Sequence, residues 1–292
     1  MSAKWRMFLL ALLMCLLMRA AGAEAAADFS ALYPDKFLPE GSDPIRTETS
    51  YQSDDVNLVI TGQRTISTDV YVVDIYVRTV ECFQRGFAGG SYGKTTARVR
   101  DTAAATNAII AMTGDSGHNF SVGWVMANGE VIRDTRNRVR DLGVVYKNGE
   151  MITIENDAVD NDAIRAQTDD IWHIFLFGPA LLDAQGKAKT DFSDSNVEAA
   201  NPRSVIGYYE PGHYCFVQID GRGAKSKLDS GKTSRGLTLE ELASFMEGLG
   251  CKAAYNLDGG QSSMLVYNGA IYSSPYGGGR NVGDIVLIKD LP

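Results

Sequence analysis

The sequence predicts a strand-rich α+β (mixed α/β) fold, with several β-hairpins and a few helices in a single domain. Three observations lead to this prediction. The segment 70–77 is rich in β-branched and aromatic residues, which is typical of a strand. Three Asn-Gly pairs each lie between apolar runs, as they do in hairpins. Only one segment carries a clear amphipathic helical pattern.

The first 25 residues have the pattern of a secretory signal peptide. Lys4 and Arg6 precede an apolar run over 7–18, and small residues at A-x-A spacing predict cleavage after Ala23 or Ala25. The run is too short for an ordinary membrane span, and an uncleaved anchor is the alternative. We therefore expect a secreted or periplasmic protein with no stable membrane span after cleavage.

The rest of the chain is expected to form one folded unit behind a short leader. Residues 26–50 contain Pro, Ser and Asp with little periodicity, so we expect an extended lead-in. No linker divides residues 51–292, which we take as one domain. Its early part is predicted to contain the strand 70–77 and a short helix over 103–108 that leads into a strand over 109–112.

The three Asn-Gly pairs predict the positions of three hairpins. They are Asn128-Gly129, Asn148-Gly149 and Asn268-Gly269. Asn-Gly readily adopts the positive φ values of a type I′ turn, so each pair is expected to join two neighbouring strands.

The clear helix begins after Thr238. Glu241 follows three residues later, which predicts a capping box, and Gly250 predicts the stop. Between them the apolar residues recur at helical spacing and indicate a face packed in the core: Leu239, Leu242, Ala243, Met246 and Leu249. Strands are then expected over 253–257 and 285–288.

The charge balance argues against nucleic acid as a partner. The chain has 28 Lys and Arg against 36 Asp and Glu, a formal charge of −8. Removing residues 1–23 takes away three basic groups and no acids, so the mature chain would carry −11. Phosphate backbones attract a positive face, so a ligand phosphate would need a local cationic pocket.

Three cysteines remain after removal of the signal peptide: Cys82, Cys215 and Cys251. An odd number allows at most one internal disulfide, and the sequence does not choose the pair. No Cys or His spacing indicates a zinc site.

Three carboxylates follow predicted strands and enter turns that contain glycine: Asp115, Asp220 and Asp258. Asp220 comes after a strand predicted over 214–218. Loops after strands often bind ligands, and glycine lets a backbone approach a ligand closely. A tight structural turn is the alternative for Asp258 and for Asp115, and it is favoured for Asp115 on residue type alone.

The run around Asp258 is the strongest of these signals. Asn256 precedes the carboxylate, and two glycines and two hydroxyls follow it: Gly259, Gly260, Ser262 and Ser263. Such a run is unusual for plain structure. We therefore treat it as the centre of a candidate site.

Three arginines lie beside Gly or Pro. They are Arg203 after Pro202, Arg222 after Gly221 and Arg280 after three glycines. The planar fork of arginine suits a phosphate or a carboxylate. For any single one of them, an ordinary surface arginine is the favoured alternative.

Several of these motifs occur together in an order that resembles the phosphodiester glycosidase family. The motifs are Gly178-Pro179-Ala180-Leu181-Leu182, Asn201-Pro202-Arg203-Ser204, Asp220-Gly221-Arg222, Gly236-Leu237-Thr238, Asn256-Leu257-Asp258-Gly259-Gly260 with Ser262-Ser263, and Arg280-Asn281-Val282. The resemblance is strongest over residues 100–290. The element Thr113-Gly114-Asp115-Ser116 departs from the family pattern, because an Asn and an aromatic residue are missing.

The resemblance implies hydrolysis of a sugar-1-phosphate diester at the anomeric carbon. Together with the signal peptide it leads us to expect an exported hydrolase that acts on a glycosyl-phosphate small molecule or polysaccharide, such as a glycan, a cell-wall polymer or an exopolysaccharide. An oxocarbenium-like transition state needs carboxylates, and a phosphate leaving group needs cations. We expect Asp258 as nucleophile or general base, Asp220 as second carboxylate and Asp115 as a weaker third acid. Substrate binding is expected from Arg203, Arg222, Arg280, Asn256, Gly259, Gly260, Ser262 and Ser263.

Two other functions remain open. The first is a metal-dependent phosphodiesterase in which Asp115, Asp220 and Asp258 hold a divalent cation, although we expect no required cofactor and no metal site. The second is a non-catalytic protein of glycan binding or exopolysaccharide assembly, which the departure at 113–116 motivates.

Overall fold

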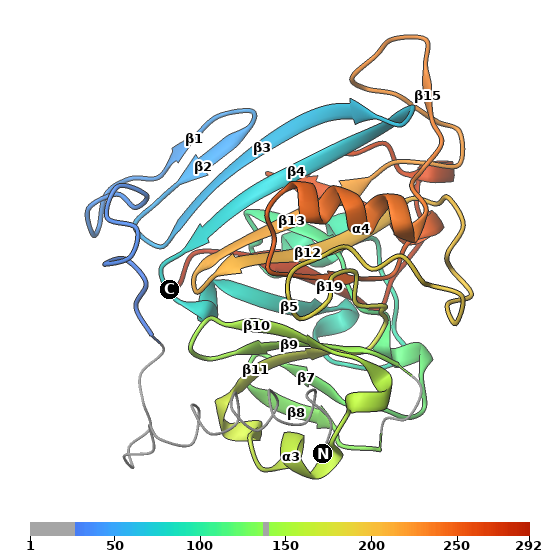
Figure 1. Ribbon diagram of the computed structural model, residues 1–292. Helices are drawn as coiled ribbons and strands as arrows, with labels where there is room; N and C mark the ends of the chain where they lie inside the picture. Colours follow the sequence, from blue (N-terminus) through green and yellow to red (C-terminus); the bar gives the residue numbers. More distant parts are fainter. Residues whose placement is uncertain (1–26, 137–139) are drawn as a thin grey trace.

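The computed structural model describes residues 27–136 and 140–292, and its strands form three large antiparallel sheets (Figure 1). The predicted signal peptide over 1–25 lies outside the described residues. Within the described ranges, no helix is long and apolar enough to cross a membrane.

The largest sheet has seven strands in the order β1-β2-β3-β4-β13-β12-β16. Their bounds are β1 Ile45–Arg46, β2 Ser50–Gln52, β3 Val56–Thr65, β4 Thr68–Val77, β13 His213–Ile219, β12 Arg203–Glu210 and β16 Ala253–Asn256. Antiparallel pairing sets Arg203 opposite Ile219 and Val205 opposite Asn256. The start of β12 and the ends of β13 and β16 therefore lie side by side at the same end of the strands.

Two five-stranded sheets and one two-stranded ribbon complete the strand content. One has the order β18-β17-β6-β19-β5: β18 Ala270–Ile271, β17 Leu265–Tyr267, β6 Ile110–Thr113, β19 Asp284–Ile288 and β5 Phe83–Phe87. The other has the order β10-β9-β11-β7-β8: β10 Met151–Ile154, β9 Leu142–Tyr146, β11 Ile171–Phe175, β7 Val125–Ala127 and β8 Glu130–Arg133. The ribbon pairs β14 Ala224–Lys225 with β15 Thr233–Ser234.

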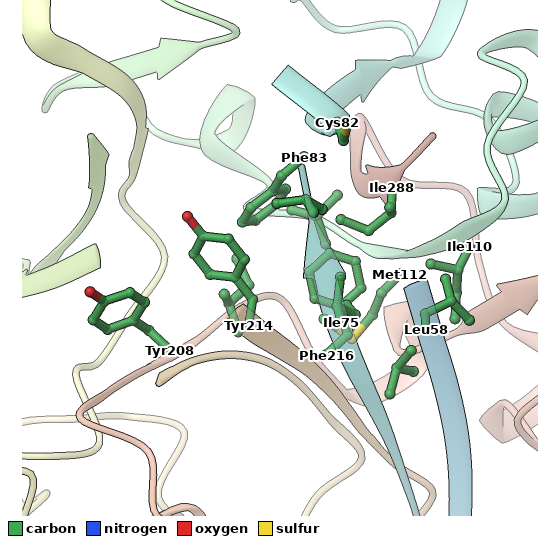
Figure 2. Packing of buried hydrophobic residues seen from close by; sticks show 14 of the residues in the cluster. Leu58, Ile75, Cys82, Phe83, Ile110, Met112, Tyr208, Tyr214, Phe216 and Ile288 are labelled. Carbon is green, nitrogen blue, oxygen red and sulfur yellow. The ribbon is translucent and has the colours of Figure 1, made fainter. Parts of the chain in front are cut away.

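The main hydrophobic core lies between the seven-stranded sheet and the sheet that contains β6 and β19. Ile75 and Phe216 come from the first sheet, Met112 and Ile288 come from the second, and all four are buried together (Figure 2). Phe29, from the predicted lead-in, is buried in the same core. The early segment is thus packed into the domain rather than detached from it.

Helix α4, Leu239–Gly248, covers the other face of the seven-stranded sheet (Figure 1). Its capping box between Thr238 and Glu241 is present, and Gly250 beyond its end has a φ of +81°. Helix α2, Val99–Ala105, packs on the outer face of the β6–β19 sheet, and α3, Asn161–Arg165, is a single short turn. The predicted start and stop of the main helix are confirmed.

The three Asn-Gly hairpins are all present. Asn128-Gly129 joins β7 to β8 and Asn268-Gly269 joins β17 to β18, with positive φ at both residues of each pair. At Asn148-Gly149 only the glycine has a positive φ. The type I′ expectation is wrong for this pair, because the turn is wider and Tyr146 N–H donates to the carbonyl of Glu150.

The strand-rich prediction with a few helices is confirmed, but the helical share is small. The described residues contain three α-helices, and the strand pairs are antiparallel, so the fold is α+β and mostly β. The short helix lies at 99–105 rather than at 103–108. Arg203, which follows Pro202, is the first residue of strand β12.

The three cysteines in the described part of the chain, Cys82, Cys215 and Cys251, are free and buried. The Sγ atoms of Cys215 and Cys251 lie 3.8 Å apart, whereas the Cys82 thiol contacts the carbonyl of Asp55. Cys215 and Cys251 are therefore the pair that is near enough to react with little movement.

Candidate active site

A pocket of about 250 Å³ opens where β12 begins and where β13 and β16 end. The antiparallel order of these three strands brings together loops that lie far apart in the sequence. The lining residues are Phe177, Val197, Asn201, Arg203, Arg222, Asp258, Gly259, Gly260, Gln261 and Arg280. Six of the eleven predicted site residues are among them.

Asp258 is the carboxylate of the pocket. It is 5% exposed and follows the end of β16 by two residues. Its Oδ2 accepts hydrogen bonds from the hydroxyls of Ser116 and Ser262, each at 2.7 Å, and from Nη2 of Arg280 at 3.2 Å. Three donors therefore fix this side chain in one orientation.

Arg280 and Ser262 form one unit with that carboxylate. Arg280 donates from Nε to Oγ of Ser262 at 2.6 Å, and the same hydroxyl donates to Asp258. The Arg280 side chain is 51% exposed, so its remaining N–H groups face solvent at the pocket. Ser262 itself is buried and does not line the pocket.

Arg203 and Arg222 bring two more cations to the pocket. Arg203 is buried, and its Nε and Nη2 donate to backbone carbonyls, among them those of Leu237 and Val197. Burial, and next the charge of Arg222, lower the pKa of Arg203 to about 10, so it remains charged at neutral pH. Arg222 is exposed and donates from Nε to Oδ1 of Asn201 at 2.8 Å.

Position 260 requires a glycine, both for its backbone conformation and for its close contact with Arg222. Its φ is +63°, and a Cβ at this position would meet the Arg222 guanidinium at 3.0 Å. At Gly259 a Cβ would meet the carbonyl oxygen of Pro202 at 2.7 Å. The two glycines therefore let the Asp258 loop lie directly against the loops that carry the arginines.

Asp115 lies in a buried ionic cluster behind the pocket. Its Oδ1 accepts the backbone N–H groups of Leu176 and Phe177 at 2.7 Å, and its Oδ2 lies 3.6 Å from Nη2 of Arg85. Arg85 also binds Asp284 at 2.7 Å, and the side chains of Arg85 and Asp115 are fully buried. Burial is the main cause that raises the pKa of Asp115 to about 6, opposed by the positive charge of Arg85.

Asp220 is also buried and does not line the pocket. Both of its oxygens accept the N–H of Ser274 at 3.0 Å. Burial raises its pKa to about 7, the Ser274 hydrogen bond opposes this, and the nearby charge of Asp69 adds to it. The structure thus separates this carboxylate from the arginines of the pocket.

Two further predicted residues support the loops around the pocket. Asn256 is buried and donates from Nδ2 to the carbonyl of Gly178 at 2.8 Å, next to the pocket residue Phe177. The Ser263 hydroxyl lies 3.4 Å from that of Ser204, which itself contacts Gln218.

The proposed metal ligands do not come together. Across residues 27–136 and 140–292, no three His, Cys, Asp or Glu side chains are placed to hold a metal ion. Asp115, Asp220 and Asp258 accordingly have separate surroundings. A three-aspartate cation site has no support in the geometry of these residues.

Sequence reasoning missed residues that carry no local pattern. Arg85 lies inside strand β5 and Asp284 begins β19, so each reads as part of an ordinary strand. Ser116 was visible only as one member of the departing element at 113–116. Its role depends on the approach of Asp258, 142 residues away in sequence.

The fold and the pocket together define an antiparallel β protein that presents one carboxylate among three guanidinium groups, a class of site suited to a phosphate-bearing ligand. The model of the phosphodiester glycosidase family matches residues 100–289, and the chain belongs to this family.

Curated relatives share this part of the chain. N-acetylglucosamine-1-phosphodiester alpha-N-acetylglucosaminidase of Mus musculus is 24% identical over 212 residues, covering 68% of this chain and 39% of the mouse protein. The Homo sapiens protein of that name is 24% identical over 215 residues, with the same coverage. The chain therefore spans about two fifths of the length of these relatives.

Solved structures are similar in fold. The zebrafish N-acetylglucosamine-1-phosphodiester alpha-N-acetylglucosaminidase catalytic domain, auto-inhibited by its pro-peptide, superposes with a TM-score of 0.60 at 18% identity, covering 81% of this chain and 83% of that one. A hypothetical protein from Synechocystis gives a TM-score of 0.54 at 12% identity, covering 85% and 64%. At these identities the likeness concerns the fold alone.

Proposed function

We propose that this protein is an exported hydrolase that cleaves a sugar-1-phosphate diester at the anomeric carbon, on a glycan, cell-wall polymer or exopolysaccharide. The observation that carries the proposal is the pocket of Asp258, Arg203, Arg222 and Arg280 in a chain of this family. The pocket gives an otherwise acidic protein a local concentration of positive charge.

The chemistry assigns one task to each kind of side chain. Asp258 attacks the anomeric carbon, or removes a proton from the water that attacks it, on the face opposite the phosphate. The bond between the anomeric carbon and the bridging oxygen breaks, and its electron pair stays with the phosphate. The arginines bind that phosphate as its charge increases.

One carboxylate is enough for this reaction. A phosphate leaves as a stabilised anion and needs less proton donation than an alkoxide, so a second carboxyl at the leaving oxygen is dispensable. We propose that Asp115 and Asp220 act on the structure of the site, because both are buried and neither lines the pocket. Asn256, Ser262 and Ser263 are assigned to the support of the Asp258 loop.

The test is a set of glycosyl-1-phosphodiesters offered to the purified protein in water enriched in ¹⁸O. We expect release of free sugar that carries the label, with an unlabelled phosphomonoester as the second product. Label in the phosphate instead would indicate a phosphodiesterase. Glycan binding without turnover would indicate a non-catalytic role, and loss of turnover after chelation would reinstate a metal.

Export is tested separately. N-terminal sequencing of the protein recovered from its native host is expected to begin at Glu24 or Ala26, as the signal peptide predicts. A chain that retains residues 1–23 in the cytoplasm would contradict the export part of the proposal and leave the hydrolase part to the labelling result.

A further inference from the structure

The two oxygens of Asp258 have very different surroundings. Oδ2 accepts the hydroxyls of Ser116 and Ser262 at 2.7 Å and Nη2 of Arg280 at 3.2 Å. Oδ1 has one contact in the described part of the chain, Nη2 of Arg280 at 3.5 Å. A carboxylate oxygen with three donors has little capacity left for a ligand, whereas Oδ1 keeps its lone pairs available.

Ser116 reaches Oδ2 because its backbone is held in an unusual conformation. Its φ is +50° and its ψ is +27°, in the left-handed region that favours glycine. The Asp284 carboxylate holds it there: Oδ1 accepts the N–H of Ser116 at 2.8 Å, and Oδ2 accepts the N–H of Asp115 at 3.1 Å. Arg85 in turn fixes Asp284.

We propose that Ser116 is a positioning residue that anchors Oδ2 of Asp258, so that Oδ1 is the reacting atom. This inference rests on the proposed glycosidase function. It gives a role to the element 113–116, where the sequence departs from the family pattern: a buried serine hydroxyl in this chain performs the anchoring. Asp284, which is paired with Arg85, holds the backbone that carries this hydroxyl.

The decisive variant is Ser116→Gly. Glycine adopts the left-handed conformation at no steric cost, so the backbone of 114–117 and its bonds to Asp284 are retained. The variant removes the CH₂OH side chain and with it the hydrogen bond to Asp258. The matched control is Asn107→Gly, which makes the same kind of change at an exposed left-handed residue (φ +55°) away from the pocket.

We expect Ser116→Gly to lower kcat by about tenfold or more, as expected for the loss of a hydrogen bond to a charged group. KM should stay within about twofold, because Ser116 does not line the pocket. Asn107→Gly should change neither. Ser262→Ala and the double variant complete a cycle, and we expect its effects to be non-additive because both hydroxyls bind the same oxygen.

A crystal structure of the Ser116→Gly protein provides a readout that does not depend on turnover. We expect the Asp258 carboxylate to rotate or to occupy two orientations. An unchanged carboxylate with an unchanged kcat would overturn the proposal, as would a loss confined to KM. If the wild type cleaves no sugar phosphodiester, the proposed function fails, and the orientation of Asp258 in this crystal structure still decides whether Ser116 anchors it.

Discussion

Two neighbouring regions of the molecule use the same chemical groups in opposite ways. In the pocket, the carboxylate of Asp258 lies beside Arg280, whose side chain is 51% exposed. In the buried ionic cluster, Asp115 and Asp284 enclose Arg85, whose side chain is fully buried. Arg222 and Arg280 are exposed at the pocket, whereas the charged groups of the cluster are buried and face one another.

The difference shows why residue type alone does not identify a site. Both regions contain an Asp that follows a strand, and both contain an arginine. Access to solvent distinguishes them, and access is set by which strands cover each loop. The two regions also meet at Ser116, whose N–H belongs to the cluster and whose hydroxyl belongs to the pocket.

The largest effect is expected from Asp258→Asn. Asparagine keeps the size of the side chain and can still accept from Ser116 and Ser262, but it removes the proposed nucleophile or base. We expect kcat on a glycosyl-1-phosphodiester to fall by about 10³-fold or more, with little change in the free energy of unfolding. Steady-state kinetics and urea unfolding measure the two quantities.

The control for this variant is Asp74→Asn, a half-buried carboxylate on strand β4 that does not line the pocket. It should retain wild-type turnover. Retention of turnover by Asp258→Asn itself would show that the reaction takes place elsewhere, and the contrast between the two regions would then lose its basis.

Arg85→Met tests the buried ionic cluster. Methionine fills much of the space, but it leaves Asp115 and Asp284 buried together without their cation. Breaking a buried ion pair in this way is expected to cost about 3–5 kcal/mol in the free energy of unfolding. Urea or thermal unfolding checks this, and a loss below about 1 kcal/mol would mean that the cluster contributes little to stability.

The sequence predicted those parts of the fold that depend on neighbours along the chain. The capping box at Thr238 and the hairpin at Asn268-Gly269 are local, so the residues that form them are visible together. The grouping of Arg203, Arg222 and Asp258 was not visible in this way. It depends on the order β13-β12-β16, which arises from long-range pairing.

The motifs shared with the family identified the segments that carry Arg203, Arg222 and Asp258. They did not show how these segments lie relative to one another. The sequence ranked Asp258 above Asp220 and Asp115, but it did not show that the latter two lie outside the pocket. That distinction depends on burial and on the donors supplied by distant strands, as Leu176 and Phe177 do for Asp115. Arg85 and Asp284 were missed because each looks like a strand residue until its partner is known.

Asp220 provides a third case, because it is a buried carboxyl that belongs neither to the pocket nor to the buried ionic cluster. Its pKa is raised to about 7 in the folded protein, against about 3.9 in the unfolded chain. Between these values the folded state binds more protons than the unfolded state, so stability is present at low pH and falls as pH rises toward 7. We expect the ionisation of Asp220 to lower the free energy of unfolding by on the order of 2–4 kcal/mol as the pH rises between these two pKa values.

Asp220→Asn should remove this dependence. The amide oxygen can still accept the Ser274 N–H, and the side chain stays neutral at every pH. Unfolding measured at pH 5 and pH 8 is expected to show a variant whose advantage in stability over the wild type is small at pH 5 and clearly larger at pH 8. Parallel pH profiles for the two proteins would mean that Asp220 is ionised in the folded state at neutral pH.

Arg280→Met is the counterpart of Arg85→Met and gives the smallest expected effect of the set. The Arg280 side chain is half exposed, so its loss should change the free energy of unfolding by only about 0.5 kcal/mol. It does remove the N–H that orders Ser262 and, on the proposed function, a charge-assisted contact to the substrate phosphate. We expect kcat/KM to fall by about 10- to 100-fold, the size of one hydrogen bond between charged groups. The same substitution of arginine by methionine is then expected to act mainly on activity at position 280 and on both stability and activity at position 85, because Arg85 fixes Asp284 and Asp284 holds Ser116. A loss of stability by Arg280→Met as large as that of Arg85→Met would show that the pocket and the cluster are energetically one unit.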